Sequence, residues 1–174
     1  MSNVFSAIAT QSGAQAARVG GKFLTFFLAE EEYGIEILKV HEIIGLMTIT
    51  RVPRTPHYIR GVINLRGKVI TVVDLRLKFG MEPCDATAET CIIVVQTQGI
   101  EIGIVVDKVS EVLDIAAKEI EDAPSFGANV NTDYILGIGK SQGRVKLLLD
   151  IDRVLSSQEV LTLRITAENA TEEA

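Results

Sequence analysis

The 174-residue sequence contains no tryptophan, and aromatic residues make up only 5% of it although 47% of its residues are hydrophobic. The core must therefore be built mainly from Ile, Val and Leu, and this β-branched composition favours sheets over helices. No apolar run reaches the roughly 20 residues that cross a bilayer, so we expect no direct membrane insertion. The first residues also lack the pattern of a secretory signal, which predicts a cytoplasmic protein.

Positive charge and metal-binding side chains are also scarce. The net charge is −6, and no basic stripe of the kind that grips phosphate backbones stands out, so nucleic acid is not an expected partner. The two cysteines, Cys84 and Cys91, form no CxxC pair and have no histidine cluster nearby. We therefore expect free thiols in a reducing compartment, and neither a metal site nor a cofactor.

The most informative feature of the sequence is an internal repeat. The segment YIRGVINLRGKVITVVDLRLKF (58–79) matches YILGIGKSQGRVKLLLDIDRVL (134–155) at a shift of 76 residues without a gap, and GIEILKVHEII (34–44) matches GIVVDKVSEVL (103–113) at a shift of 69. The difference of seven is accounted for by a longer connector in the second copy, 114–133 against 45–57. One unit therefore occurs twice.

Each unit is predicted to contain five short strands joined by tight turns, which is typical of a small β-barrel that hides its edges. In the first copy the strands are expected at 23–28, 33–38, 39–44, 61–65 and 68–75. Gly67 is expected to supply a positive φ in the last hairpin, and Gly143 repeats it. Units of about 60 residues bury little surface alone, so the two should pack together.

The expected domain organisation has three parts. Residues 1–21 are small and polar and are predicted to be a flexible leader, and 22–160 to form one domain, with a first barrel mainly in 22–80 and a second mainly in 90–155. Ser156 and Glu159 fit a capping box, which predicts a short helix after the second barrel. Residues 161–174 are assigned to the end of that helix and an acidic tail that frays from residue 166.

The sequence has none of the common motifs of nucleophilic, nucleotide-binding or metal-dependent enzymes. Its two histidines, His41 and His57, are predicted to be surface residues. Asp74 and Asp150 occupy equivalent repeat positions, so each is expected to end its own strand by hydrogen bonding to a neighbouring loop rather than to do acid–base chemistry. A small enzyme that uses Asp74, Arg66 and Glu42 is a remote alternative, because a nucleophile–base pair is missing.

The hairpin tip at Arg66 differs between the two copies, because Gln142 stands in its place in the second. The barrel does not require arginine there, and a solvated turn residue and a partner contact are both open readings. Glu42 recurs as Glu111, which favours a shared structural or surface role.

Val40 recurs as Val109, near the junction of the second and third strands of each unit. Core packing is the stronger reading for any single valine. If the two copies of this element face one another, however, they would form an apolar groove between the barrels that suits an amphipathic helix.

The segments EEYGIEILKVHEI, PHYIRGVINLRGKVITVVDLRLKFG and GIVVDKVSEVL resemble the CheW family of bacterial chemotaxis coupling proteins, over about Phe23 to Glu159. The resemblance implies an all-β fold of two intertwined five-stranded SH3-like barrels, with strands exchanged between them and a short C-terminal helix. It also implies a non-catalytic adaptor. Its expected partners are the regulatory domain of the histidine kinase CheA and the helical signalling tip of a chemoreceptor, which would recruit it to membrane-associated receptor arrays.

The resemblance assigns two sets of site residues. A receptor-binding groove between the barrels is expected at Leu24, Ile37, Val40, Val105 and Val109. A surface that couples to receptor or kinase, not divided between them, is expected at Glu42, Gly61, Asn64, Arg66, Gly103 and Val112. The sequence departs from many relatives at Thr71, where they carry proline, and at His41, which could tune partner choice.

Two relatives of other architecture are not expected. CheA would need phosphotransfer, dimerisation and ATP-binding domains, and a CheV-type adaptor adds a receiver domain, whereas about 20 residues follow the second predicted barrel. The closer alternative is a CheW-like adaptor of a different chemosensory pathway, such as surface motility. The sequence leaves that choice open.

Overall fold

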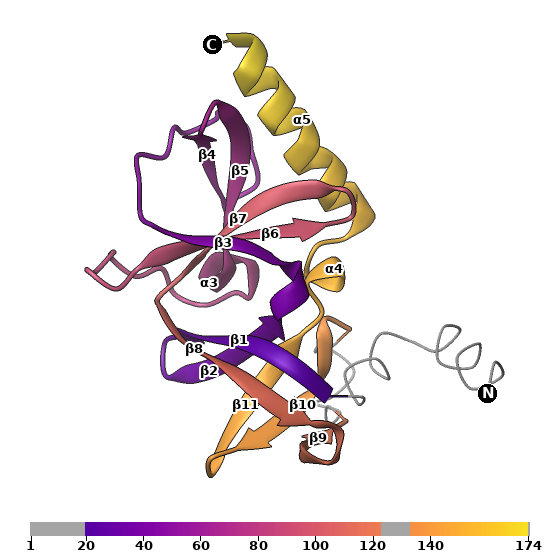
Figure 1. Ribbon diagram of the computed structural model, residues 1–174. Helices are drawn as coiled ribbons and strands as arrows, with labels where there is room; N and C mark the ends of the chain where they lie inside the picture. Colours follow the sequence, from indigo (N-terminus) through magenta and orange to yellow (C-terminus); the bar gives the residue numbers. More distant parts are fainter. Residues whose placement is uncertain (1–19, 123–132, 174) are drawn as a thin grey trace, which may run out of the picture.

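A computed structural model describes residues 20–122 and 133–173, and these are mainly β-strands in two sheets (Figure 1). The leader predicted at 1–21 lies outside the described residues except for Gly20 and Gly21, which begin the first strand. The strands are β1 (Gly20–Leu28), β2 (Glu31–Glu36), β3 (Val40–Gly45), β4 (Ile59–Leu65), β5 (Lys68–Asp74), β6 (Cys91–Thr97), β7 (Ile100–Val106), β8 (Lys108–Ala116), β9 (Ile120–Glu121), β10 (Ile135–Ser141) and β11 (Arg144–Leu149).

The two sheets exchange hairpins between the repeats. The first barrel has the strand order β3-β6-β7-β5-β4 and the second has β8-β1-β2-β11-β10-β9. The β1–β2 hairpin of the first repeat therefore lies beside β8 and β11, and the β6–β7 hairpin of the second repeat lies beside β3 and β5 (Figure 1). Each sheet therefore takes strands from both halves of the chain, so the strand exchange expected between the barrels at 22–80 and 90–155 is present.

The sequence repeat is also a structural repeat. Strand β1 pairs with β8 as β3 pairs with β6, antiparallel in both cases. Strand β2 pairs with β11 as β5 pairs with β7, parallel in both cases. Parallel pairing needs a long connection between its strands. Here α3 and β6 lie between β5 and β7, and β3 to β10 lie between β2 and β11.

Each barrel is closed by the connector that follows its third strand. Thr50 and Val62 exchange two backbone hydrogen bonds of 2.9 Å, and β9 pairs with β10 in the equivalent place. A Cβ at Gly61 would lie 2.1 Å from the Thr50 carbonyl oxygen, and one at Gly137 would lie 2.8 Å from that of Glu121. The closing strand leaves no room for a side chain, which explains why both positions are glycine.

The predicted hairpin turns are confirmed. Leu65 pairs with Lys68, and the two residues between them, Arg66 and Gly67, have φ values of 52° and 86°. Gln142 and Gly143 repeat this with 56° and 73°. Positive φ at both central residues defines the type I′ turn that matches the twist of paired strands.

The largest hydrophobic cluster contains side chains from both sheets, for example Phe26 and Ile35 from the second barrel and Ile93 and Val95 from the first. Most of its members are aliphatic, as the composition predicts. Four aromatic residues form one stack. Phe26, Tyr33, Phe79 and Tyr134 follow one another with ring centroids 5.9, 5.9 and 5.0 Å apart. This shared core is what joins the two barrels.

Helices follow the last strand of each repeat. Asp74 caps α3 (Leu75–Lys78) by accepting from the Leu77 amide at 3.3 Å, and Asp150 caps α4 (Ile151–Val154) by accepting from the Asp152 amide at 3.0 Å. The structural role predicted for the two aspartates is therefore confirmed. No helix in the described parts of the chain is long and apolar enough to cross a membrane.

The C-terminal helix α5 (Ser157–Glu173) lies beside β5 and is longer than predicted (Figure 1). Its capping box is confirmed, because the Ser156 amide donates to Glu159 at 2.8 Å and the Glu159 amide donates to the Ser156 hydroxyl at 3.1 Å. The Thr71 hydroxyl donates to the Leu163 carbonyl at 2.9 Å in a buried position. This hydrogen bond and the burial of Thr166 hold the helix on the barrel, so residues 166–173, which were expected to fray, are helical.

The second barrel contains a buried ion pair that the first does not have. Lys146 is 1% exposed, and its Nζ lies 3.4 Å from a carboxylate oxygen of Glu32 and donates to the Ser141 carbonyl at 3.1 Å. The residue at the equivalent repeat position in the first barrel is Ile70, also buried. The barrel architecture therefore accepts an aliphatic side chain where the second copy has a charge.

We expect Lys146→Ile alone to destabilise the protein by about 3 kcal/mol, because it leaves the Glu32 carboxylate buried without its cation. The double variant Lys146→Ile, Glu32→Leu should recover most of this loss, since it replaces a buried pair with apolar side chains. Denaturant unfolding of the three proteins measures both values. Equal stability of the single and double variants would show that the two charges are not coupled.

Candidate partner-binding site

Three of the five predicted groove residues lie half-buried against the core that the barrels share. Ile37 begins the 3₁₀ helix η1 (Ile37–Lys39), Val40 begins β3, and Val109 follows the first residue of β8. All three are packed against the shared cluster while keeping part of their surface accessible. We call Ile37, Val40 and Val109 the junction residues. They offer apolar surface where the two sheets meet.

The other two predicted groove residues are core residues. Leu24 is 2% exposed within the shared cluster, and Val105 is 6% exposed within the cluster of the first barrel. Both lie on strands with neighbours on either side, β1 between β8 and β2, and β7 between β6 and β5. Their side chains therefore support the surface from beneath and do not line it.

A further apolar residue at this place is Leu38, which is 90% exposed on η1 and was not among the predicted site residues. The repeat holds a signal that could have identified it. Its counterpart in the second copy is Asp107, so the position does not belong to the conserved core of the unit. Leu38 lies between Ile37 and Val40 in the chain and extends the apolar surface outward.

An ion pair lies next to each place where the chain crosses from one barrel to the other, and the two pairs are arranged with opposite polarity. Lys39 donates to Asp152 at 2.8 Å, and Arg76 donates through Nε to Asp107 at 2.8 Å. Arg76 and Asp152 are repeat equivalents, so the charges are reversed between the two copies. Burial raises the pKa of Asp152, but hydrogen bonds from Lys39 and Thr97 outweigh it and the pKa lies below its ordinary value. The pair that fixes η1 is therefore ionised at neutral pH.

The structure brings together two residues of the predicted coupling surface, Arg66 and Glu42. The Arg66 guanidinium donates to both carboxylate oxygens of Glu42, with Nη1 3.3 Å from Oε2 and a shorter contact from Nη2. The Glu42 hydrogen bond raises the pKa of Arg66. The pair links the β4–β5 hairpin tip to β3 and leaves most of the arginine side chain exposed.

More charges continue from this pair across the first barrel. His41 contacts Gln96 at 2.8 Å and Glu101 at 3.2 Å through its two ring nitrogens, and Lys68 donates to the other oxygen of Glu101. The Lys68 hydrogen bond, opposed by burial and aided by His41, lowers the pKa of Glu101. His41 is therefore an exposed surface residue, as predicted, and part of a row of paired charges.

Four predicted coupling residues remain. Three of them, Asn64, Gly61 and Gly103, affect the backbone, and the fourth, Val112, has an exposed side chain. Asn64 accepts from the Gly67 amide at 2.8 Å, which fixes the turn that carries Arg66. A Cβ at Gly103 would lie 2.8 Å from a methyl group of Ile92, and Gly61 faces the closing strand. Val112 lies on β8 and is 48% exposed. Only Val112 among these presents a large side chain to solvent.

The arrangement does not support the enzyme alternative. Asp74 is 6% exposed, and its side chain is engaged by Arg60 at 3.1 Å and by the α3 cap, whereas Arg66 and Glu42 pair with each other. The three side chains thus belong to two separate hydrogen-bonded groups. Within 20–122 and 133–173, no cluster of three or more His, Cys, Asp or Glu side chains could hold a metal ion.

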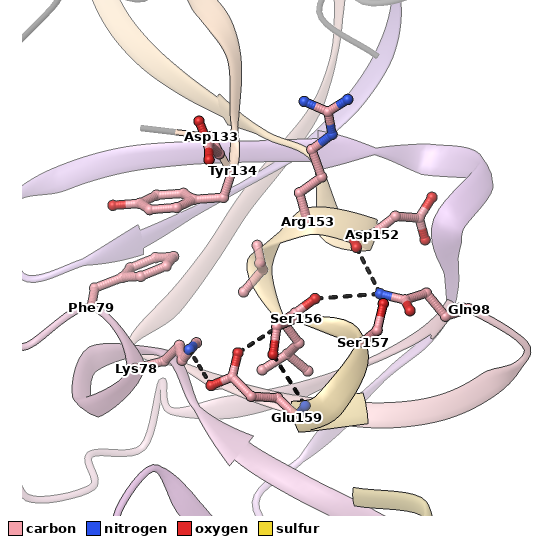
Figure 2. A pocket seen from close by; sticks show the side chains of 12 residues that line it. Lys78, Phe79, Gln98, Asp133, Tyr134, Asp152, Arg153, Ser156, Ser157 and Glu159 are labelled. Carbon is pink, nitrogen blue, oxygen red and sulfur yellow. Dashed lines mark hydrogen bonds and ion pairs between the residues drawn. The ribbon is translucent and has the colours of Figure 1, made fainter. Parts of the chain in front are cut away.

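Figure 2 shows a hollow of about 740 Å³ at the start of α5. Lys78 donates to Glu159 at 2.5 Å, and the Gln98 side chain donates to the Asp152 carbonyl at 2.8 Å. Burial, aided by Glu159, raises the pKa of the neighbouring Tyr58 to about 12. These groups satisfy one another and anchor the helix. None of the predicted site residues lines this hollow.

Together these features define a protein of two SH3-like barrels that share strands and one core, with apolar surface at their junction and paired charges beside it. Comparison with known proteins gives the family: the CheW-like domain matches residues 22–159. The chain belongs to the CheW family.

Three relatives illustrate the match. The chemotaxis protein CheW of Klebsiella aerogenes is 43% identical over 153 residues, which cover 88% of this chain and 92% of the relative. CheW of Bacillus subtilis is 37% identical over 142 residues, 81% of this chain and 90% of the relative. The crystal structure of the scaffolding protein TtCheW from Thermoanaerobacter tengcongensis superposes with a TM-score of 0.73 at 35% identity, covering 80% of this chain and 97% of that one.

We expect Gly61→Ala to destabilise the protein by about 3 kcal/mol, because the new methyl group would collide with the Thr50 carbonyl and the φ of 142° disfavours a side chain. Gly67→Asn is the matched control, since it has a positive φ but nothing within 4 Å of the added Cβ. Thermal unfolding of both variants tests this. A stable Gly61→Ala protein with impaired partner binding would instead make Gly61 a contact residue.

Proposed function

We propose that this chain is a non-catalytic adaptor of bacterial chemotaxis that couples chemoreceptors to the histidine kinase CheA. Its membership of the CheW family and the scaffold and chemotaxis names of its relatives support the role. The observation that carries the proposal is the half-buried apolar surface of Ile37, Val40 and Val109 over the shared core, beside the Glu42–Arg66 pair. The adaptor acts in the cytoplasm and is recruited to receptor arrays.

The proposed mechanism is one of binding and geometry. An amphipathic helix of the receptor signalling tip packs its apolar face on the junction residues, with Leu38 as an outer contact. The row of charges that begins at Arg66 and Glu42 fixes the register of the bound partners, since charge complementarity contributes more to specificity than to affinity. The exchanged hairpins make the two barrels one body, so a displacement at one partner's site is passed to the other.

The second proposed partner is the regulatory domain of CheA. A solution of CheA, receptor signalling fragments and this protein, with kinase rate as the readout, tests the coupling directly. Receptor-dependent control of phosphorylation that requires this protein supports the proposal. If the protein neither binds CheA nor alters that control, the coupling role is wrong. Repeating the assay with the kinase and receptors of a surface-motility pathway distinguishes the alternative assignment.

Val40→Asp should weaken binding of a receptor signalling fragment at least about tenfold, because it places an unpaired charge in apolar surface. Val40 is only half-buried, so the variant should fold. Val145→Asp is the matched control, at an exposed valine of β11 in the second barrel. Titration calorimetry with circular dichroism separates the two effects. Unfolding of Val40→Asp would assign Val40 to the core instead.

Arg66→Ala should reduce receptor control of the kinase at least about fivefold and leave the melting temperature nearly unchanged, because the side chain is largely exposed. Gln142→Ala is the control at the equivalent tip of the second barrel, with the same positive φ. Kinase assays and thermal melts of both variants decide the matter. A large loss of stability with normal coupling would return Arg66 to a structural role.

A further inference from the structure

The chain has a negative net charge, but one of its segments is strongly basic. Residues 43–73 contain four arginines and one lysine and not one Asp or Glu. Part of this charge is neutralised by carboxylates outside the segment, through the pairs Arg66–Glu42, Lys68–Glu101 and Arg60–Asp74. Arg51 and Arg54 are exposed and have no acidic partner anywhere in the described residues. Positive charge therefore remains at one place, the connector between β3 and β4.

The two free arginines lie around a hollow of about 490 Å³ in this connector. Its other polar lining residues include His57 and Arg60, and Val52, Pro53 and Ile59 contribute apolar walls. We call Arg51, Arg54, His57 and Arg60 the basic connector. Cationic side chains around a partly apolar hollow suit a ligand that brings carboxylates and some apolar surface, because arginine binds carboxylates in a bidentate geometry.

The connector is held in place by its own hydrogen bonds. The Thr55 hydroxyl donates to the Val52 carbonyl at 2.9 Å, the Ile59 amide donates to the Pro56 carbonyl at 3.0 Å, and Thr50 is paired with Val62 on the barrel wall. Arg54 has a φ of 63°, in the left-handed region that non-glycine residues seldom adopt. The cations are therefore presented from an ordered backbone, which lowers the entropy cost of binding.

The fold itself does not require this charge, as the second copy shows. The equivalent connector, 114–133, contains five acidic residues and a single lysine. Glu121 occupies the closing position that Thr50 occupies in the first barrel. Since the same architecture is built with opposite charge, the basic connector is a property of the surface and not of barrel closure.

We propose that the basic connector is a docking site for a carboxylate-bearing segment of a protein partner, with Arg51 and Arg54 as its principal contacts. None of the junction residues lines the hollow of the basic connector. The inference rests on the adaptor role proposed above, since it assigns a surface to one of the adaptor's partners.

The test uses the full chain with Arg51→Glu and Arg54→Glu together. The control is Lys118→Glu with Arg144→Glu, two exposed cations of the second barrel, so the change in net charge is the same. Binding to the CheA regulatory domain, to a receptor signalling fragment and to a DNA duplex is measured at low and at physiological salt. Circular dichroism verifies that both variants fold.

The expected result is that the wild-type protein binds at least one of the two protein partners. The Arg51, Arg54 variant should then lose about tenfold or more in affinity for that partner and much of its salt dependence, while the control changes little. Unchanged binding of the variant to both partners would overturn the docking site and leave the adaptor role intact. If the wild-type protein binds neither partner, both proposals fail. Loss confined to DNA binding would show a general polyanion site and would also overturn the proposal.

Discussion

The exchange of hairpins between the two repeats is the constraint on which the rest of this structure depends. Strands β1 and β2 complete the barrel of the second repeat, and β6 and β7 complete that of the first. Neither repeat can form its sheet from its own half of the chain, so the two barrels must form together. The shared hydrophobic core follows from this arrangement, because the exchanged strands carry apolar side chains such as Phe26 and Ile93 into a common cluster.

The exchange also explains why the candidate site lies where it does. The chain passes from one barrel to the other directly after β2 and after β7, and the residues next to these crossings are Ile37 to Val40 and Val109. At such a crossing apolar side chains rest on the core without being covered by a second layer. The reversed ion pairs Lys39–Asp152 and Arg76–Asp107 fix the crossings, and they give each one a different local charge.

The two copies of the repeat are nearly symmetric but differ at particular surface positions. The two copies agree at positions where the backbone excludes a side chain or requires a positive φ, such as Gly61 and Gly137 or Gly67 and Gly143. They differ at the hairpin tips and in the connectors that close the barrels, where nothing in the fold demands a particular side chain. An adaptor that must tell two partners apart needs such differences, because symmetric surfaces would bind both alike.

Prediction of individual residues succeeded where a local rule decides the outcome and failed where burial depends on the neighbours. The turn glycines, the structural role of Asp74 and Asp150 and the Ser156–Glu159 capping box follow from local rules, and the structure confirms them. The short helices that the two aspartates cap were not predicted. Leu24 and Val105 were expected at a surface but are core residues. Alternation along a strand gives the face of a side chain, but not whether another strand covers that face.

The sequence by itself determined the repeat, the all-β fold and the resemblance to the CheW family, because repeated motifs and hydrophobic alternation are properties of the linear chain. Only the tertiary structure decided which strands belong to which barrel, since strand exchange leaves the local pattern unchanged. It also decided the pairing of Arg66 with Glu42, which are 24 residues apart, and the freedom of Arg51 and Arg54 from any carboxylate in the described residues. Ion pairs depend on which loops the folded chain brings together, and no spacing in the sequence encodes that directly.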